Sequence, residues 1–354
     1  MSKPQVTRRQ FVRDSAGVAA AAAAGATVAG MGAEASGAPD ATKTRSYNEN
    51  MEYRRLGRTN LMISAVSIGG HWKKIPHGYR TPDFKKNRRE VLAACMDHGI
   101  NYIDACWDSE VITYGEAIQG RRDDLFFGLS FGAHESRFPD WARSVKTMKE
   151  GFEMGLKAGG LDHVDLWRIT MHEQTSARNT PQEIEIAIEV LDWAKKTGKA
   201  RFTGVSSHDR PWITEAVARY PQLEVIVTPY TAKTKAKPEG SMFDALKKHD
   251  VGMIGIKPFA SGAVFKSQGQ PDSETKQEDD EIARMVLRYV LCCDVLTAAI
   301  PGLITIDQVK NAAAAVKQPR EFTEAEAARY EELTKDMWDR LPRDYGWLRD
   351  WEWV

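Results

Sequence analysis

From Met51 onward, short runs of apolar, mostly β-branched residues alternate with longer segments whose apolar residues recur at helical spacing. This alternation is typical of βαβ units that build a parallel sheet. Each run is short enough for one buried strand, and most of the intervening segments are long enough for a crossover helix. The predicted strands span 63–69, 101–106, 125–130, 163–170, 201–206, 224–230, 253–259 and 297–301.

The predicted helices lie between these strands and cover 86–98, 142–158, 181–197, 211–219, 279–291 and 306–316. Helix start signals support several of them, such as Thr180 before Pro181. Repeats of this kind favour one α/β fold, a (β/α)8 TIM barrel, over a doubly wound sheet, and no G-x-G-x-x-G turn follows the first strand. In such a barrel the functional side chains lie just after the carboxyl ends of the strands.

Segments on either side of the repeats complete the predicted domain. Residues 51–64 (MEYRRLGRTNLMIS) are expected to form an N-terminal β-hairpin, and a helical, aromatic-rich C-terminal tail runs from 322 to 354. The small, polar stretch 36–50 has no apolar period, so it predicts a disordered linker. The barrel domain is therefore expected to span 51–354.

Residues 1–35 resemble an export signal more than part of a folded domain. The segment 7–13 (TRRQFVR) matches the twin-arginine pattern, 16–32 is rich in Ala and Gly, and 33–35 (AEA) offers a cleavage site. The Ala/Gly-rich stretch is too weakly apolar for a stable membrane anchor. We expect export by the twin-arginine machinery to the periplasm or another extracytoplasmic space, removal of residues 1–35, and no stable membrane insertion afterwards.

The charge of the chain is balanced, with 49 basic and 49 acidic residues and no run of like charge. This balance argues against nucleic acid or an anionic membrane as a partner and favours a small molecule. The cysteines show neither zinc-ligand nor redox spacing, so they are interpreted as buried small hydrophobic residues. They are Cys95, Cys106, Cys292 and Cys293.

Five short motifs resemble the aldo-keto reductase superfamily, in the order and at the spacing of that family. They are 53–59 (YRRLGRT), 99–104 (GINYID), 164–167 (VDLW), 204–206 (GVS) and 299–302 (AIPG). The resemblance covers 51 to about 331 and implies a (β/α)8 barrel whose bottom is closed by the hairpin.

The resemblance also implies a catalytic set, which this chain only partly keeps. The family reduces carbonyls with NADP(H), using an Asp, a Tyr proton donor, a Lys that lowers the pKa of the Tyr, and a His that orients the substrate. Asp104 matches the Asp, whereas Ser109, Ser130 and Thr170 stand at the positions of the Tyr, Lys and His. Tyr114 is an alternative proton donor, although a helix residue packed on the barrel is the simpler interpretation.

The family's site for a nicotinamide dinucleotide is better retained. Tyr230 stands where an aromatic ring stacks on the nicotinamide, and 257–262 (KPFASG) resembles a loop that wraps the pyrophosphate. No Lys or Arg directly after the last strand selects a 2′-phosphate, so the choice between NADP and NAD stays open. The predicted cofactor contacts are Ser206, Ser207, Tyr230, Lys257, Phe259, Gly262, Gly302 and Asn311.

The predicted catalytic residues are Asp104, His172 and Lys257. An alternative site for a divalent metal comprises His134, His172 and His208, which follow three neighbouring strands. It is not favoured, because the histidines show no spacing such as H-E-x-x-H.

Together these features predict an exported oxidoreductase that holds a nicotinamide dinucleotide loaded before export and acts on a small carbonyl or sugar. Two alternatives stay open. One is a metal-dependent hydrolase or lyase on the same face of the barrel, and the other is a catalytically inactive barrel that binds a ligand.

Overall fold

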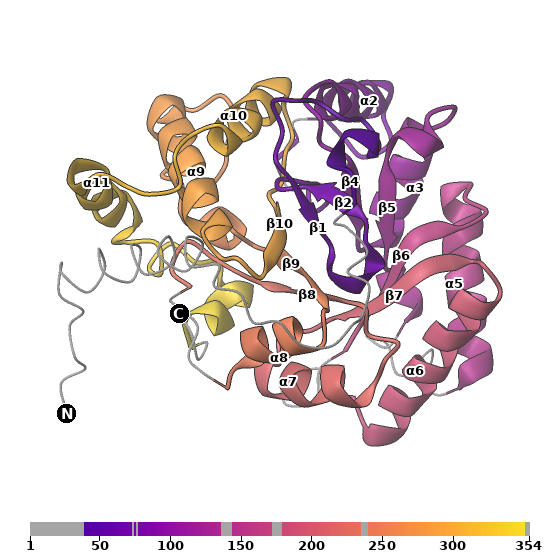
Figure 1. The fold of residues 1–354 in the computed structure, drawn as a ribbon. Helices are drawn as coiled ribbons and strands as arrows, with labels where there is room; N and C mark the ends of the chain where they lie inside the picture. Colours follow the sequence, from indigo (N-terminus) through magenta and orange to yellow (C-terminus); the bar gives the residue numbers. More distant parts are fainter. Residues whose placement is uncertain are drawn as a thin grey trace.

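A computed structural model describes residues 39–72, 74–75, 77–135, 144–171, 179–234 and 240–350 (Figure 1). Within them, eight parallel strands form the predicted (β/α)8 barrel, in the order β10-β9-β8-β7-β6-β5-β4-β3. A parallel bridge between Val66 and Ala299 joins the two ends of this sheet. The strands are β3 (Ile68–Gly69), β4 (Tyr102–Ala105), β5 (Phe126–Leu129), β6 (Val164–Thr170), β7 (Ala200–Ser206), β8 (Val225–Pro229), β9 (Gly252–Ile256) and β10 (Leu296–Ile300).

The predicted N-terminal hairpin is confirmed and consists of β1 (Tyr53–Arg55), η2 (Gly57–Thr59) and β2 (Met62–Ser64). Its apolar side chains Leu56, Leu61 and Ile63 pack with the inward-facing residues of the strands in one buried cluster. Gly57 has a φ of +48°, and a Cβ at this position would lie 2.2 Å from the backbone nitrogen of Gly252. A glycine is therefore required where the hairpin meets the barrel.

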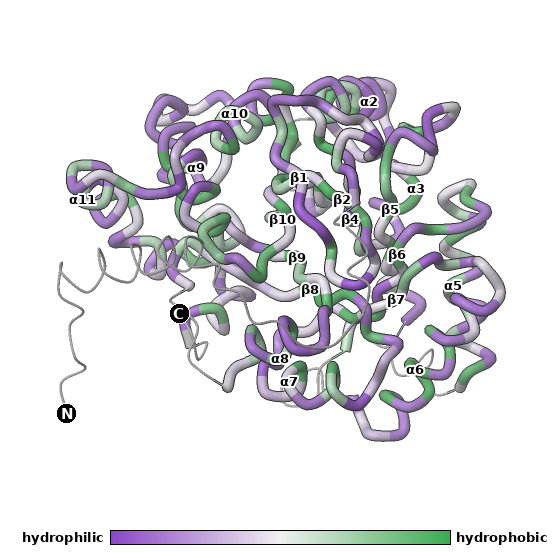
Figure 2. The backbone as a smooth tube through the Cα atoms, in the orientation of Figure 1, coloured by the Kyte–Doolittle hydropathy of each residue, from purple (hydrophilic) through white to green (hydrophobic). Residues whose placement is uncertain are grey.

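The helices form the outer layer, and Figure 2 shows hydrophilic and hydrophobic stretches alternating along them. Such two-sided helices bury their apolar faces against the strands and leave their polar faces to solvent. Thr180 caps its helix as predicted, because its side chain and that of Glu183 form a capping box. The helices are α2 (Pro82–Asp97), α3 (Asp108–Ala117), α5 (Val145–Gly159), α6 (Pro181–Lys196), α7 (Arg210–Arg219), α8 (Met242–Lys248), α9 (Lys276–Leu291) and α10 (Ile306–Val316).

The extent of the first predicted strand, 63–69, is wrong. This run divides between β2, which pairs with β1 in the hairpin, and β3, which pairs with β4 in the barrel. Residues 63–69 (ISAVSIG) are all buried, so the burial pattern contains no mark where the chain leaves one sheet for the other.

The disordered linker predicted at 36–50 is also wrong for residues 39–50, which are ordered against the barrel. Arg45 donates hydrogen bonds to the Leu125 carbonyl oxygen at 2.6 Å and to Asp165 Oδ2 at 3.0 Å. Ser46 Oγ donates to the Asp124 carbonyl oxygen at 2.8 Å. The segment is held by polar contacts, which a search for apolar periodicity does not detect.

The C-terminal tail contains α11 (Glu324–Thr334) and the 3-10 segment η6 (Arg343–Asp350). Tyr330 is buried and its hydroxyl donates to the Ala232 carbonyl oxygen at 2.7 Å, which fastens α11 beside the barrel. Among the described residues, no helix combines the length and apolarity that a membrane crossing requires. The predicted export signal, 1–35, lies outside the described residues.

Asp165, at the start of β6, is the buried anion at the centre of an ion cluster. Its carboxylate accepts from Arg45 at 3.0 Å, Arg122 at 2.8 Å and Arg201 at 2.6 Å, and from the Phe127 N–H at 3.0 Å. Burial opposes ionisation, but the guanidinium groups of Arg122 and Arg45 hold the pKa of Asp165 below its ordinary value of 3.8.

We predict that Asp165→Asn lowers the free energy of unfolding by roughly 3 kcal/mol, because it leaves the arginines without their shared anion. A depressed carboxyl pKa stabilises the folded state above the unfolded value and stops doing so as the pH falls through the folded value. The difference between the wild type and Asp165→Asn should therefore shrink below about pH 4. Denaturant unfolding at several pH values measures it. An effect no larger than that of the exposed control Asp162→Asn would contradict the prediction.

Candidate functional site

A cavity of about 1090 Å³ opens where the barrel strands end. One end lies at the barrel mouth, at Asp104 and Arg168, and the cavity continues between the loop after β9 and helix α10. Residues of η6, including Trp347, form part of its wall. Its volume is at the upper limit of ordinary ligand pockets, so it can hold a large cofactor together with a small substrate.

Asp104 forms a buried ion pair at this mouth. Its Oδ1 and Oδ2 accept hydrogen bonds from Arg168 Nε at 2.8 Å and Nη2 at 2.5 Å. Burial opposes the charge on the guanidinium, yet Asp104 raises the pKa of Arg168 above its ordinary value. The cation beside Asp104 therefore comes from β6.

Ser109, Ser130 and Thr170, which the resemblance places at the positions of the family's Tyr, Lys and His, do not line the cavity. Ser109 lies in the first turn of α3, and Ser130 Oγ donates to the buried Glu135 at 2.7 Å. Thr170 is the last residue of β6 and is buried. Tyr114 is also buried, and its hydroxyl donates to the Gly69 carbonyl oxygen at 2.5 Å. Its packing role is therefore the one that the structure supports.

His71, Cys106 and Glu110 form a cluster on the wall beside Asp104. His71 Nδ1 lies 2.8 Å from Glu110 Oε1, and Cys106 Sγ lies 3.5 Å from the same nitrogen. Burial disfavours the charge on Glu110, but His71 and the backbone N–H groups of Cys106 and His71 hold the pKa of Glu110 below its ordinary value. The interpretation of Cys106 as a mere small hydrophobic residue therefore misses its polar contacts.

Lys257, His208 and Trp347 form a second cluster at the mouth. Lys257 Nζ lies 3.5 Å from His208 Nε2, and the rings of His208 and Trp347 stack with centroids 4.2 Å apart. The ammonium can only donate, so Nε2 accepts and the proton of a neutral imidazole resides on Nδ1. Trp347 also lies over the ammonium, 5.5 Å from Nζ to the ring centre. The tail thus covers part of the cavity.

Most of the predicted cofactor contacts line the cavity, namely Ser206, Lys257, Phe259, Gly262, Gly302 and Asn311. Ser207 does not, and its Oγ accepts from the Asp209 N–H at 3.1 Å. Tyr230 does not either, because the alternation along β8 turns its ring outward against Phe243. The predicted stacking of Tyr230 on a nicotinamide ring does not agree with this placement.

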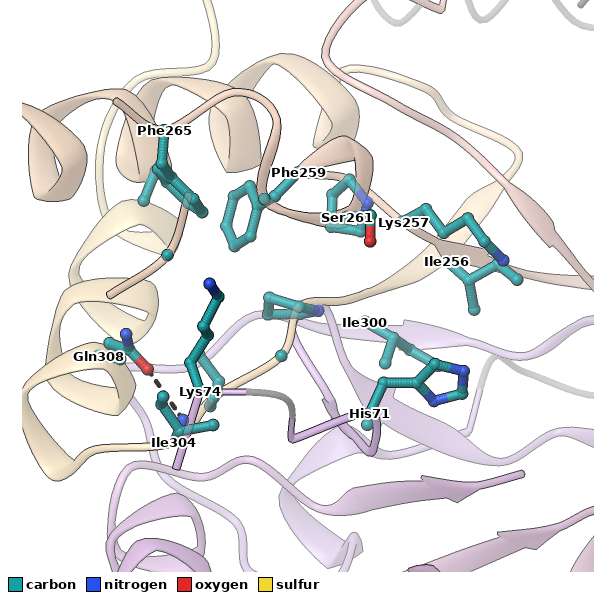
Figure 3. Close-up of a pocket in the computed structure, with 18 of the residues that line it drawn as sticks. His71, Lys74, Ile256, Lys257, Phe259, Ser261, Phe265, Ile300, Ile304 and Gln308 are labelled. Carbon is teal, nitrogen blue, oxygen red and sulfur yellow. Dashed lines mark hydrogen bonds between the residues drawn. The ribbon is translucent and has the colours of Figure 1, made fainter. Parts of the chain in front are cut away.

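The loop after β9 is strained next to the cavity. Lys257, Ala260 and Ser261 have φ values of +58°, +46° and +58°, which non-glycine residues rarely adopt. Such strain clusters at ligand sites. Figure 3 shows Lys74 extending from the opposite side toward Phe259, a cation that the sequence analysis did not identify.

The alternative metal site is not assembled in the described residues. His134 lies 3.1 Å from Asp108, His208 belongs to the Lys257 cluster, and His172 lies outside the described residues. The group with metal-ligand proximity in the described ranges is His71, Cys106 and Glu110. The sequence could have predicted that His71 and Cys106 lie close together. Each follows one of the first two barrel strands, and the carboxyl ends of these strands are neighbours.

The position of Arg168 in the sequence also indicates that its side chain is buried and paired. Leu166 faces the barrel interior, so Arg168, two residues later on the same strand, faces it as well. A charge at such a position requires a partner of opposite charge. The carboxylate of Asp104 is this partner.

We predict that Arg168→Met lowers the free energy of unfolding by roughly 3 to 5 kcal/mol, because it leaves Asp104 buried and unpaired. The double variant Asp104→Asn/Arg168→Met should be more stable than this single variant, because it buries no unpaired charge. Denaturant unfolding measures both. If Arg168→Met matches the exposed control Arg89→Met, the ion pair does not stabilise the barrel.

Sequence comparison finds distant relatives with different names. A probable voltage-gated potassium channel subunit beta from Arabidopsis thaliana is 26% identical over 229 residues, which are 60% of this chain and 66% of that protein. This chain thus spans just under two thirds of that relative. An L-galactose dehydrogenase from Arabidopsis thaliana is 23% identical over 293 residues, which are 76% of this chain and 89% of that protein.

Solved structures share the fold. An aldo-keto reductase from Bacillus halodurans in its holo form has a TM-score of 0.59 and 23% identity, covering 80% of this chain and 96% of that one. An aldo/keto reductase from Klebsiella pneumoniae, in complex with NADP and acetate, has a TM-score of 0.60 and 18% identity, covering 80% and 95%. The model of the aldo/keto reductase family matches residues 65–335. This match covers most of the chain, which therefore belongs to the aldo/keto reductase family.

Proposed function

We propose that this chain is an exported oxidoreductase that holds NADP or NAD in the cavity and transfers a hydride to or from a small carbonyl or sugar. The continuity of the cavity carries the proposal, because it extends from the Asp104–Arg168 pair to the loop after β9 and helix α10. The NADP-bound Klebsiella pneumoniae relative and the L-galactose dehydrogenase support the cofactor class and the substrate class.

The residues along the cavity fit a dinucleotide. Lys74 supplies positive charge for a pyrophosphate, and Phe259 and Phe265 supply apolar surface near it (Figure 3). Lys276, on α9, also lines the cavity, but its ammonium pairs with Asp280 at 2.6 Å. These contacts favour an anionic cofactor without selecting NADP over NAD.

The barrel mouth holds the groups that would handle the proton. A bound nicotinamide would supply or accept the hydride. Lys257 could give a proton from Nζ to a carbonyl oxygen or alkoxide, which leaves a neutral amine, and the neutral imidazole of His208 could donate a hydrogen bond through Nδ1–H. They take the role that Ser109, Ser130 and Thr170 cannot fill from outside the cavity. The predicted catalytic role of Lys257 is retained in this proposal, and that of His172 stays a prediction.

Export is part of the proposal. The twin-arginine pattern at 7–13 supports passage of the folded chain, with its cofactor already bound, to an extracytoplasmic space. A tightly held dinucleotide would then be reduced and reoxidised by two successive substrates.

The second candidate function is a barrel that binds a ligand without turnover. It is favoured because Ser109, Ser130 and Thr170, at the positions of the family's Tyr, Lys and His, do not line the cavity.

We predict that the purified chain, freed of bound dinucleotide by unfolding, desalting and refolding, binds NADPH or NADH saturably, observed as quenching of tryptophan emission, since Trp107 and Trp347 line the cavity. Lys74→Met should weaken binding about 10- to 100-fold, the effect of losing one charge-assisted hydrogen bond to the pyrophosphate. The exposed control Lys248→Met should bind like the wild type. If neither dinucleotide gives a saturable response, the oxidoreductase proposal fails and the ligand-binding alternative remains.

We predict that replacing Arg8 and Arg9 by lysine retains the chain in the cytoplasm, because the export machinery reads the arginine pair. Cell fractionation followed by immunoblotting measures the distribution. The control Lys3→Arg changes a charged residue outside the pattern and should be exported normally. Equal distribution of the double variant and the wild type would show that the pair does not direct export.

A further inference from the structure

The cluster of His71, Cys106 and Glu110 has no role in the proposed hydride transfer. These residues come from the loop after β3, the residue after β4, and the first turn of α3. Nδ1 of His71, Sγ of Cys106 and a carboxylate oxygen of Glu110 all lie within 4.8 Å of one another. The geometry points to a site for a divalent transition-metal ion of the zinc class, bound by His71, Cys106 and Glu110 at the cavity wall.

The spacing of the ligand atoms fits tetrahedral coordination. Zinc–sulfur and zinc–nitrogen bonds of ordinary length, at a tetrahedral angle, separate the sulfur and nitrogen by roughly 3.5 Å. Cys106 Sγ and His71 Nδ1 are 3.5 Å apart. Glu110 Oε1 lies 2.8 Å from Nδ1, so a small outward movement of the exposed His71 ring would open space for an ion.

The charges also match a divalent cation. A metal binds the thiolate of Cys106 and the neutral imidazole of His71, so it would displace the thiol proton and any proton between Nδ1 and Oε1. The thiolate and the Glu110 carboxylate then carry two negative charges, which one divalent ion neutralises. Sulfur and imidazole ligands select zinc-class ions over Mg²⁺ and Ca²⁺, which prefer oxygen.

The backbone holds Glu110 in position for this task. Its Oε1 accepts from the His71 N–H at 2.6 Å, and its Oε2 accepts from the Cys106 N–H at 2.8 Å. A Cβ on Gly70 would lie 1.9 Å from the carboxylate carbon, so the carboxylate requires glycine at this position. His71 has a φ of +63°, a strained conformation that its bond to Glu110 stabilises. Supporting hydrogen bonds of this kind orient metal-ligating side chains.

The site has the ligand count of catalytic zinc centres, which take three protein ligands and leave one position for water or substrate. His71 and Cys106 line the cavity together with Asp104, so the fourth position faces the same space as the proposed substrate. An ion there would bind a carbonyl or hydroxyl oxygen. Metal binding does not depend on the proposed dinucleotide, because none of the three ligands is a predicted cofactor contact.

The experiment titrates the full chain, treated with chelator and desalted, with Co²⁺ and then Zn²⁺. One equivalent of Co²⁺ should give the visible bands of a tetrahedral ion and a near-ultraviolet thiolate-to-cobalt band, and Zn²⁺ should abolish both. Cys106→Ser should remove the thiolate band and weaken binding by more than about 100-fold, because loss of a supporting residue alone costs roughly 10- to 100-fold. His71→Gln should weaken binding similarly. The control His134→Gln should bind normally.

Two results would overturn the proposal. One is the absence of stoichiometric Co²⁺ and Zn²⁺ binding by wild-type chain whose near-ultraviolet circular dichroism shows that it is folded. The other is stoichiometric binding that neither Cys106→Ser nor His71→Gln weakens, which would place the ion elsewhere. Fast alkylation of Cys106 without metal binding would indicate a reactive thiol, and it would also contradict the metal site.

Discussion

The hydrogen bonds that join the first and last strands of the barrel determine where every functional side chain lies. The Ser67 N–H donates to the Ala299 carbonyl oxygen at 3.0 Å, and the Ala299 N–H donates to the Ala65 carbonyl oxygen at 2.9 Å. This closure brings the carboxyl ends of all eight strands to one mouth. Residues as distant in sequence as His71 and Lys257 therefore line the same cavity. Loops can then change the chemistry while the barrel stays the same.

The Asp104–Arg168 pair shows such a change. Family resemblance implies a lysine on the third barrel strand, where this chain has Ser130, and the cation instead comes from the fourth strand. A buried carboxylate needs a partner of opposite charge wherever that partner originates, because an unpaired charge costs several kcal/mol. In this chain that partner is Arg168. Proton transfer in the proposed reaction falls to Lys257, beside His208.

The sequence predicts the barrel well because strand and helix periodicities are local properties. The strands at 101–106 and 297–301 are confirmed as β4 and β10 within one or two residues. The division of 63–69 between two sheets was not predictable, because both halves are buried. Order at 39–50 was missed because long-range polar contacts, such as that of Arg45 with Asp165, hold the segment.

The site was harder to predict because it depends on contacts between strands. Position-by-position comparison locates Asp104, but it does not point to Arg168, whose signal is that it shares the inward face of its strand with Leu166. Composition classes Cys106 as apolar, although it follows the strand next to that of His71, and the fold then brings both side chains to Glu110. Tyr230 does not line the cavity, because alternation along a strand turns its ring to the outer layer, and a comparison by position does not show which way a side chain points.

The central claim is that the cavity carries a nicotinamide dinucleotide bound before export. The most direct measurement recovers the chain from the extracytoplasmic fraction, releases its small molecules by denaturation, and identifies them by mass spectrometry. We expect NADP(H) or NAD(H) in close to equimolar amount. Exported, folded chain that releases no dinucleotide would contradict the claim.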